Sequence, residues 1–94
     1  MEEILGAKRD DILRLAAKHG AHNLRIFGSV ARGEAGPDSD IDLLIDVGLF
    51  TSPWFPAGLI LDLEALLGRP VEVVTERALD PCIRERVLAE AIRL

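Results

Sequence analysis

The sequence has few of the residues on which several classes of protein depend. Its 94 residues include one cysteine, no tyrosine, three phenylalanines and one tryptophan. A single cysteine, Cys82, cannot form a disulfide within the chain, which is typical of proteins of the reducing cytoplasm. Four aromatic residues are too few for the stacking platforms that bind single-stranded nucleic acid. We therefore expect a cytoplasmic protein without a base-stacking surface.

Long apolar runs and an excess of positive charge are also missing. The apolar runs are short, as at residues 43–45 and 59–61, whereas a membrane-spanning helix needs about 20 apolar residues. The first residues, Met-Glu-Glu, are acidic, unlike the basic start of a secretory signal. The net charge of −5 is opposite to that of proteins that bind nucleic acid through its phosphates. We expect neither a membrane segment nor direct nucleic-acid binding.

What remains is the composition of one small globular domain. Hydrophobic residues make up 49% of the chain and charged residues 29%, a balance that excludes disorder over most of its length. The length fits a single domain over residues 1–94. A domain of this size buries roughly 60–65% of the surface of its unfolded chain. The core is therefore thin, and a second copy of the chain is one candidate for covering what the core does not.

Hydrophobic periodicity predicts helices that alternate with strands. The expected elements are a helix over 3–19, a strand over 24–27, a turn at 29–33, a strand over 41–47, a helix over 57–67, a strand over 71–75, and a last helix that starts at Pro81 and carries an apolar stripe from Ile83 to Leu94. The loop before the helix over 57–67 contains Phe50, Trp54 and Phe55. We expect it to fold over the core; the alternative is an exposed apolar patch for a partner. The order αβ(turn)βαβα predicts an α/β fold with a small sheet packed against helices.

Two aspartates stand at the start of the best strand, where short charged side chains are unfavourable. Asp40 and Asp42 flank Ile41, and the two-residue period of a strand places both carboxylates on one face, about 6.5–7 Å apart at Cα. Carboxylates this close repel each other unless a cation neutralises them, and Mg²⁺ prefers such oxygen ligands. The pair indicates a site for Mg²⁺ or Mn²⁺; the alternative is an acidic turn that runs into a strand.

A Gly-Ser pair precedes the two aspartates and follows the first strand. Gly28 allows a phosphate to approach the backbone, Ser29 adds a hydroxyl that can also cap the turn, and Arg32 follows one turn later. Backbone N–H groups in such a turn can bind an anion. The three residues therefore predict a phosphate-binding site; the alternative is an ordinary Gly-Ser turn with a capping serine.

The two motifs together resemble the signature of the DNA polymerase β-type nucleotidyltransferase superfamily. Gly28-Ser29 is separated by ten residues from Asp40-Ile41-Asp42, and the wider string from Phe27 to Gly33 with Ser39 to Leu44 resembles the minimal nucleotidyltransferases, or MNT domains. These are the MntA-like antitoxins, whose partners are HEPN-domain toxins. The resemblance covers nearly the whole chain and implies a minimal nucleotidyltransferase fold with a short mixed sheet backed by helices.

The resemblance also implies an activity and a set of site residues. The implied reaction transfers AMP from ATP to a hydroxyl, typically a tyrosine of the HEPN toxin, with Mg²⁺ or Mn²⁺ as cofactor. Asp40 and Asp42 would be catalytic metal ligands, while Gly28, Ser29 and Arg32 would bind the nucleotide. The family's third carboxylate is usually an aspartate, and Glu72 stands at that position here.

Glu72 leaves two interpretations open. As a third metal ligand it would support the chemical step; as an exposed strand acid it would leave the site with two carboxylates. The function therefore also has two candidates. One is a catalytic protein adenylyltransferase, and the other is an antitoxin with weak or no catalysis that neutralises its partner by forming a complex. A template-dependent polymerase is excluded, because no domain remains to hold a template.

Overall fold

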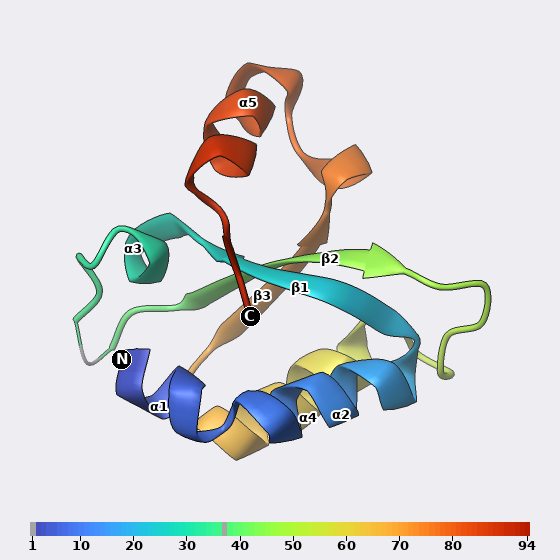
Figure 1. Ribbon diagram of the computed structural model, residues 1–94. Helices are drawn as coiled ribbons and strands as arrows, with labels where there is room; N and C mark the ends of the chain where they lie inside the picture. The colour runs from blue at the N-terminus through green and yellow to red at the C-terminus, as the bar shows by residue number, and fades with distance from the viewer. Residues whose placement is uncertain (1, 37) are drawn as a thin grey trace.

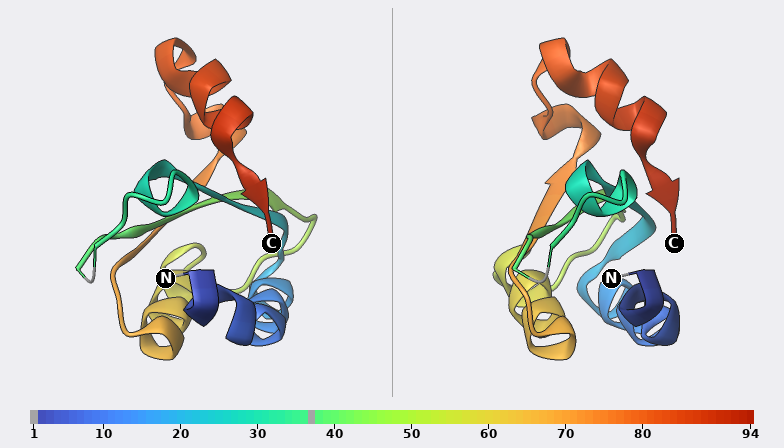
Figure 2. Two further views of the ribbon diagram at one scale, coloured as in Figure 1. Left: turned by 60° about the vertical axis from the view of Figure 1, so that its left-hand side comes forward. Right: turned by 90° about the vertical axis from the view of Figure 1, so that its left-hand side faces the viewer.

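The described residues of the computed structural model, 2–36 and 38–94, form a four-stranded sheet with helices on both faces (Figures 1 and 2). The elements in order are α1 (Glu2–Ala7), α2 (Arg9–His19), β1 (Ala21–Phe27), α3 (Gly28–Ala31), β2 (Ile41–Val47), α4 (Ala57–Leu67), β3 (Val71–Thr75), the 3₁₀ turn η1 (Glu76–Ala78), α5 (Pro81–Glu90) and β4 (Ile92–Arg93). The order of helices, strands and turn expected from the sequence is confirmed, although β1 begins at Ala21 instead of residue 24 and further differences are described below. No helix in these ranges is both long enough and apolar enough to cross a bilayer.

The sheet is mixed, as the resemblance implies. Its strand order is β3-β2-β1-β4, with β2 and β3 parallel and both pairs that involve β1 antiparallel. In this register Asp42 is the Cα partner of Phe27 on one side and of Glu72 on the other. The sheet therefore places the start of β2, the start of β3 and the end of β1 next to one another.

The main core lies between the sheet and the helices α2 and α4, which cover one face together with α1 (Figure 1). Alternation along β2 directs Ile41, Leu43 and Ile45 into this core, where each is at most 1% exposed. Val47, the last residue of the strand, continues this alternation but lies at the edge of the core and is 42% exposed. The helix α4 also buries a single stripe rather than most of its surface, and its Leu61 is 66% exposed.

A smaller apolar cluster lies on the opposite face of the sheet, beneath α5 (Figure 1). Leu44, Leu79 and Val87 are its buried members, and Phe27 and Val74 pack against them. Because side chains alternate along a strand, the residues on either side of Leu44 on this face are Asp42 and Asp46. The face that carries α5 is therefore also the face of the candidate carboxylates.

Both ends of the chain differ from the sequence prediction. The expected first helix is divided into α1 and α2 at Lys8, where the backbone departs from helical geometry with φ −106° and ψ 8°. The last helix ends at Glu90 instead of continuing to Leu94, because Ala91 is extended and the next residues pair with β1 as β4. Between α3 and β2, the Ser39 amide donates a hydrogen bond to the Gly36 carbonyl (3.2 Å), while Pro37 itself lies outside the described residues.

The aromatic loop before α4 does not fold over the core as predicted. Phe55 packs against the core, but Phe50 is 87% and Trp54 86% exposed. Polar contacts attach the loop instead: the buried imidazole of His19 contacts Ser52 Oγ through Nδ1 (2.5 Å) and Asp62 Oδ2 through Nε2 (2.6 Å). The loop is thus fixed to His19 of α2, which also contacts α4, while two aromatic side chains remain in solvent.

Candidate active site

Three carboxylates gather where β2 and β3 begin. Asp42 and Glu72 are Cα partners on these parallel strands, and Asp40 precedes β2 by one residue. Asp42 is half-buried, whereas Asp40 and Glu72 are exposed. The structure therefore brings the sequence-predicted third acid beside Asp42, on the sheet face that carries α5.

The electrostatics of Asp42 show that these acids interact. The pKa of Asp42 is raised to about 6. Burial is the largest cause, the charge of Glu72, a hydrogen bond with Glu72 and the charge of Asp40 act in the same direction, and the charge of Arg32 acts against them. The carboxylate of Asp42 therefore lies next to other acids, and the positive charge of Arg32 does not balance their negative charge.

This donor set fits a hard divalent cation. Mg²⁺ and Mn²⁺ prefer carboxylate oxygens, and Mg²⁺ in particular is often held by one or two carboxylates together with phosphates of the substrate. Within the described ranges, no three aspartate, glutamate, histidine or cysteine side chains already form a metal-binding cluster. A pair of carboxylates completed by phosphate oxygens of a nucleotide is a ligand set of this kind.

Gly28 lies directly against the carboxylate of Asp42. Its φ of +75° is in the left-handed region, and a Cβ at this position would lie 2.3 Å from Oδ2 and 3.2 Å from Cγ of Asp42. Backbone conformation and close packing each favour glycine here. The expected role of this glycine is to let a phosphate approach the backbone, and the structure adds a contact with a candidate metal ligand.

Ser29 and Arg32 belong to the short helix α3 and its end. The prediction that Ser29 caps this turn is wrong: the N-cap is Phe27, without a side-chain capping bond, because the turn already begins at Gly28. Arg32 is the C-cap, and its amide donates to the Gly28 carbonyl (3.1 Å). The three expected nucleotide-binding residues thus lie within one turn, beside Asp42.

Glu90, at the end of α5, is the residue of this region that the sequence analysis missed. Its Oε1 accepts the Gly28 N–H (2.9 Å), and both its carboxylate oxygens lie 3.2 Å from Nη1 of Arg32. The Gly28 hydrogen bond and then Arg32 hold the pKa of Glu90 below its usual value. No local motif marks a glutamate three residues after Val87, and only the docking of α5 on the sheet brings it here.

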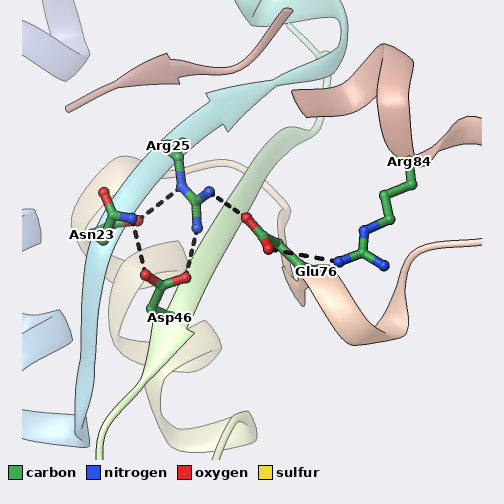
Figure 3. Close-up of polar contacts among 5 residues, drawn as sticks. All are labelled: Asn23, Arg25, Asp46, Glu76 and Arg84. Carbon is green, nitrogen blue, oxygen red and sulfur yellow. Dashed lines mark hydrogen bonds and ion pairs between the residues drawn. The ribbon is translucent and has the colours of Figure 1, made fainter. Parts of the chain in front are cut away.

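A second polar cluster lies farther along the same face, past Leu44 (Figure 3). Arg25 donates to Asp46 Oδ1 (2.8 Å) and to Glu76 Oε1 (2.9 Å), and Asn23 donates to Asp46 Oδ2 (2.9 Å). Arg84 of α5 approaches Glu76 to 3.9 Å. Hydrogen bonds from Asn23 and the charge of Arg25 keep the pKa of Asp46 below its usual value. Asp46 is thus a structural ion-pair partner and not a fourth acid of the candidate site.

Comparison with known proteins assigns the chain to a family. The model of the nucleotidyltransferase domain family matches residues 10–94. Protein adenylyltransferase MntA of Thermococcus cleftensis is 37% identical over 92 residues, which cover 98% of this chain and 90% of that protein. The match therefore includes every candidate site residue from Gly28 to Glu90.

Solved structures agree with this assignment. One described as "Structure of putative minimal nucleotidyltransferase" superposes with a TM-score of 0.84 at 52% identity, over 98% of this chain and 94% of that one. A toxin-antitoxin crystal structure with AMP-PNP shares the fold, with a TM-score of 0.73 at 20% identity, over 89% of this chain and 69% of that one. The chain belongs to the nucleotidyltransferase domain family.

Proposed function

We propose that this protein is a metal-dependent protein adenylyltransferase that acts as the antitoxin of a toxin–antitoxin pair. It would transfer AMP from ATP to a tyrosine hydroxyl of a HEPN-domain toxin. The observation that carries the proposal is the pairing of Asp42 with Glu72, next to Asp40 and in contact with Gly28. The name of the Thermococcus relative and the AMP-PNP in a related toxin-antitoxin structure support the nucleotide and the kind of partner.

The residues divide into two groups with different tasks. Asp40, Asp42 and Glu72 would hold Mg²⁺, which polarises the phosphates and offsets charge that develops on them during transfer. Ser29, Arg32 and the backbone at Gly28 would bind the two outer phosphates. The tyrosine oxygen attacks the α-phosphorus, its proton passes to Glu72, and pyrophosphate leaves as its bond to the α-phosphorus breaks.

The role of Glu72 gives the sharpest test of catalysis. If Glu72 accepts the proton, Glu72→Gln should lower the rate of AMP transfer by about 10²–10⁴ and leave ATP affinity within a few-fold. Glu72→Asp keeps the acid and should remain active. Labelled AMP transfer to the cognate toxin, measured for the three proteins, checks this. Equal transfer by the wild type and Glu72→Gln would remove Glu72 from the chemistry.

A second candidate is an antitoxin that works by contact alone. The observation that favours it is the exposure of Phe50 and Trp54, since aromatic side chains anchor many protein interfaces. This candidate predicts that the wild type and Glu72→Gln neutralise the toxin equally well without ATP. Tight complex formation with no labelled AMP on the toxin would favour it.

A further inference from the structure

Glu90 accepts hydrogen bonds from the donor groups that the proposed function assigns to the triphosphate. The Gly28 amide and Nη1 of Arg32 both bond to its carboxylate, and both are donors suited to phosphate oxygens. Arg32 is also held by Glu34, whose Oε2 lies 3.0 Å from Nε. In this structure an anion of the chain itself therefore occupies the donors that an incoming phosphate needs.

The position of Gly28 connects this contact with the carboxylate site. The amide of Gly28 faces Glu90, whereas its Cα lies against the carboxylate of Asp42. A nucleotide whose metal lies at Asp42 and whose outer phosphates reach Arg32 thus meets Glu90 on its path. Three acids at the metal site and Glu90 all repel the phosphates until a cation neutralises them.

A cationic neighbour is available to Glu90 if it leaves Arg32. Arg86 precedes it by four residues on α5 and lies close enough to contribute to its lowered pKa. Both residues line one pocket with Gly28, Arg32 and Val87. The pocket therefore offers the carboxylate a second partner on its own helix.

From this arrangement we propose that Glu90 controls nucleotide entry: its carboxylate substitutes for a phosphate on Gly28 and Arg32 in the empty protein, and the triphosphate must displace it. The proposal rests on the proposed function, because it assumes that these donors bind the nucleotide. Apparent affinity falls in proportion to the fraction of molecules in which the donors are available. If Glu90 occupies them in about nine molecules of ten, affinity is about tenfold below that of an open site.

A purely structural role for the same contact has the opposite signature. If Glu90 only ties α5 to the end of β1 and orders Arg32, its removal should leave nucleotide binding unchanged or weaken it. If it competes with phosphate, its removal should tighten binding. The sign of the change in affinity therefore separates the two roles.

Calorimetric titration of the full chain tests the proposal. Glu90→Gln is nearly isosteric and keeps a neutral acceptor for the Gly28 amide, while Glu85→Gln removes one charge from an exposed position of the same helix. We expect Glu90→Gln to bind Mg·ATP about tenfold more tightly than the wild type, with Glu85→Gln within about twofold. Glu90→Asp, which keeps the charge on a shorter side chain, should lie between the wild type and Glu90→Gln.

Inorganic tripolyphosphate with Mg²⁺ serves as a second probe, because it carries the phosphate tail without the nucleoside. A similar gain for tripolyphosphate and for ATP supports competition at the phosphate donors. Unchanged or weaker binding by Glu90→Gln, while the wild type binds Mg·ATP and Asp42→Asn does not, overturns the role of Glu90 and leaves the proposed function standing. Absence of Mg·ATP binding by both the wild type and Glu90→Gln overturns both.

Discussion

Replacing Asp42 with asparagine should stabilise the empty protein and abolish its response to the metal–nucleotide complex. The pKa of Asp42 is raised to about 6 in the folded chain, against about 3.9 for an unfolded aspartate. Between these values the native state binds more protons, so the free energy of unfolding falls as the pH rises from about 4 to 6. The change removes an ionised group from beside Glu72 and Asp40.

The magnitude follows from the size of the shift and the exposure of the group. Two pKa units correspond to about 2.7 kcal/mol, and solvent screening of a half-buried group reduces this to roughly 1–1.5 kcal/mol. Asp42→Asn should therefore be about 1 kcal/mol more stable than the wild type at pH 7 without divalent ions. Near pH 4 the two proteins should be equally stable, because Asp42 is then protonated in the wild type.

Urea denaturation at pH 4.5 and pH 7, with EDTA or with Mg²⁺ and a non-hydrolysable ATP analogue, measures these effects. With the complex at about 100 times its Kd, the wild type should gain about 2.7 kcal/mol and the variant very little. Two results would refute the reasoning: a variant less stable than the wild type at pH 7 in EDTA, or a variant that keeps the Mg·nucleotide gain. The first would show that Asp42 is not strained by its neighbours, and the second that it is not a metal ligand.

Three further predictions concern the surroundings of the site. In chemical denaturation, Gly28→Ala should lower the free energy of unfolding by about 1–3 kcal/mol more than Gly33→Ala does. Both glycines have a positive φ, but only a Cβ at Gly28 would strike Asp42. Equal losses would show that backbone strain alone matters. Asp46→Asn should lose roughly 0.5–1 kcal/mol at pH 7, and, because the pKa of Asp46 is lowered in the folded state, this difference should shrink as the pH falls below about 4. Leu44→Ala should cost about 2–4 kcal/mol and Trp54→Ala less than about 0.5 kcal/mol, since Leu44 is fully buried and Trp54 is 86% exposed; thermal melts that rank these two in the opposite order would contradict the assignment of the cores.

Sequence reasoning worked best where one physical rule decides a position. Alternation along β2 correctly separated the core residues from Asp42, and the helix expected over 57–67 has these bounds as α4. The family resemblance marked Glu72 as the candidate third carboxylate, and the parallel register of β2 and β3 pairs it with Asp42. Each of these predictions depends on a short stretch of sequence, read either by itself or through the family resemblance.

The errors arise where tertiary packing overrides local pattern. The two residues of β4 are too few to produce a periodic signal, and they become a strand only because β1 offers its edge. The apolar side chains of the loop before α4 favoured packing over the core. Instead, Ser52 of this loop contacts His19, and the Trp54 ring remains in solvent. Glu90 meets Gly28 across 62 positions of sequence, a contact that no local pattern encodes.

The two apolar clusters on opposite faces of the sheet differ greatly in size, and this difference has a consequence for motion. Among the described residues, the cluster that joins α5 to the sheet has three buried members, Leu44, Leu79 and Val87 of α5 itself, whereas α2 and α4 cover a much larger cluster. Segments with few buried contacts open at a free energy below that of global unfolding. We therefore expect the amides of α5 to exchange with deuterium through partial opening, well before those of β2. Such an opening carries Glu90 away from Gly28, so partial unfolding of α5 also uncovers the phosphate donors.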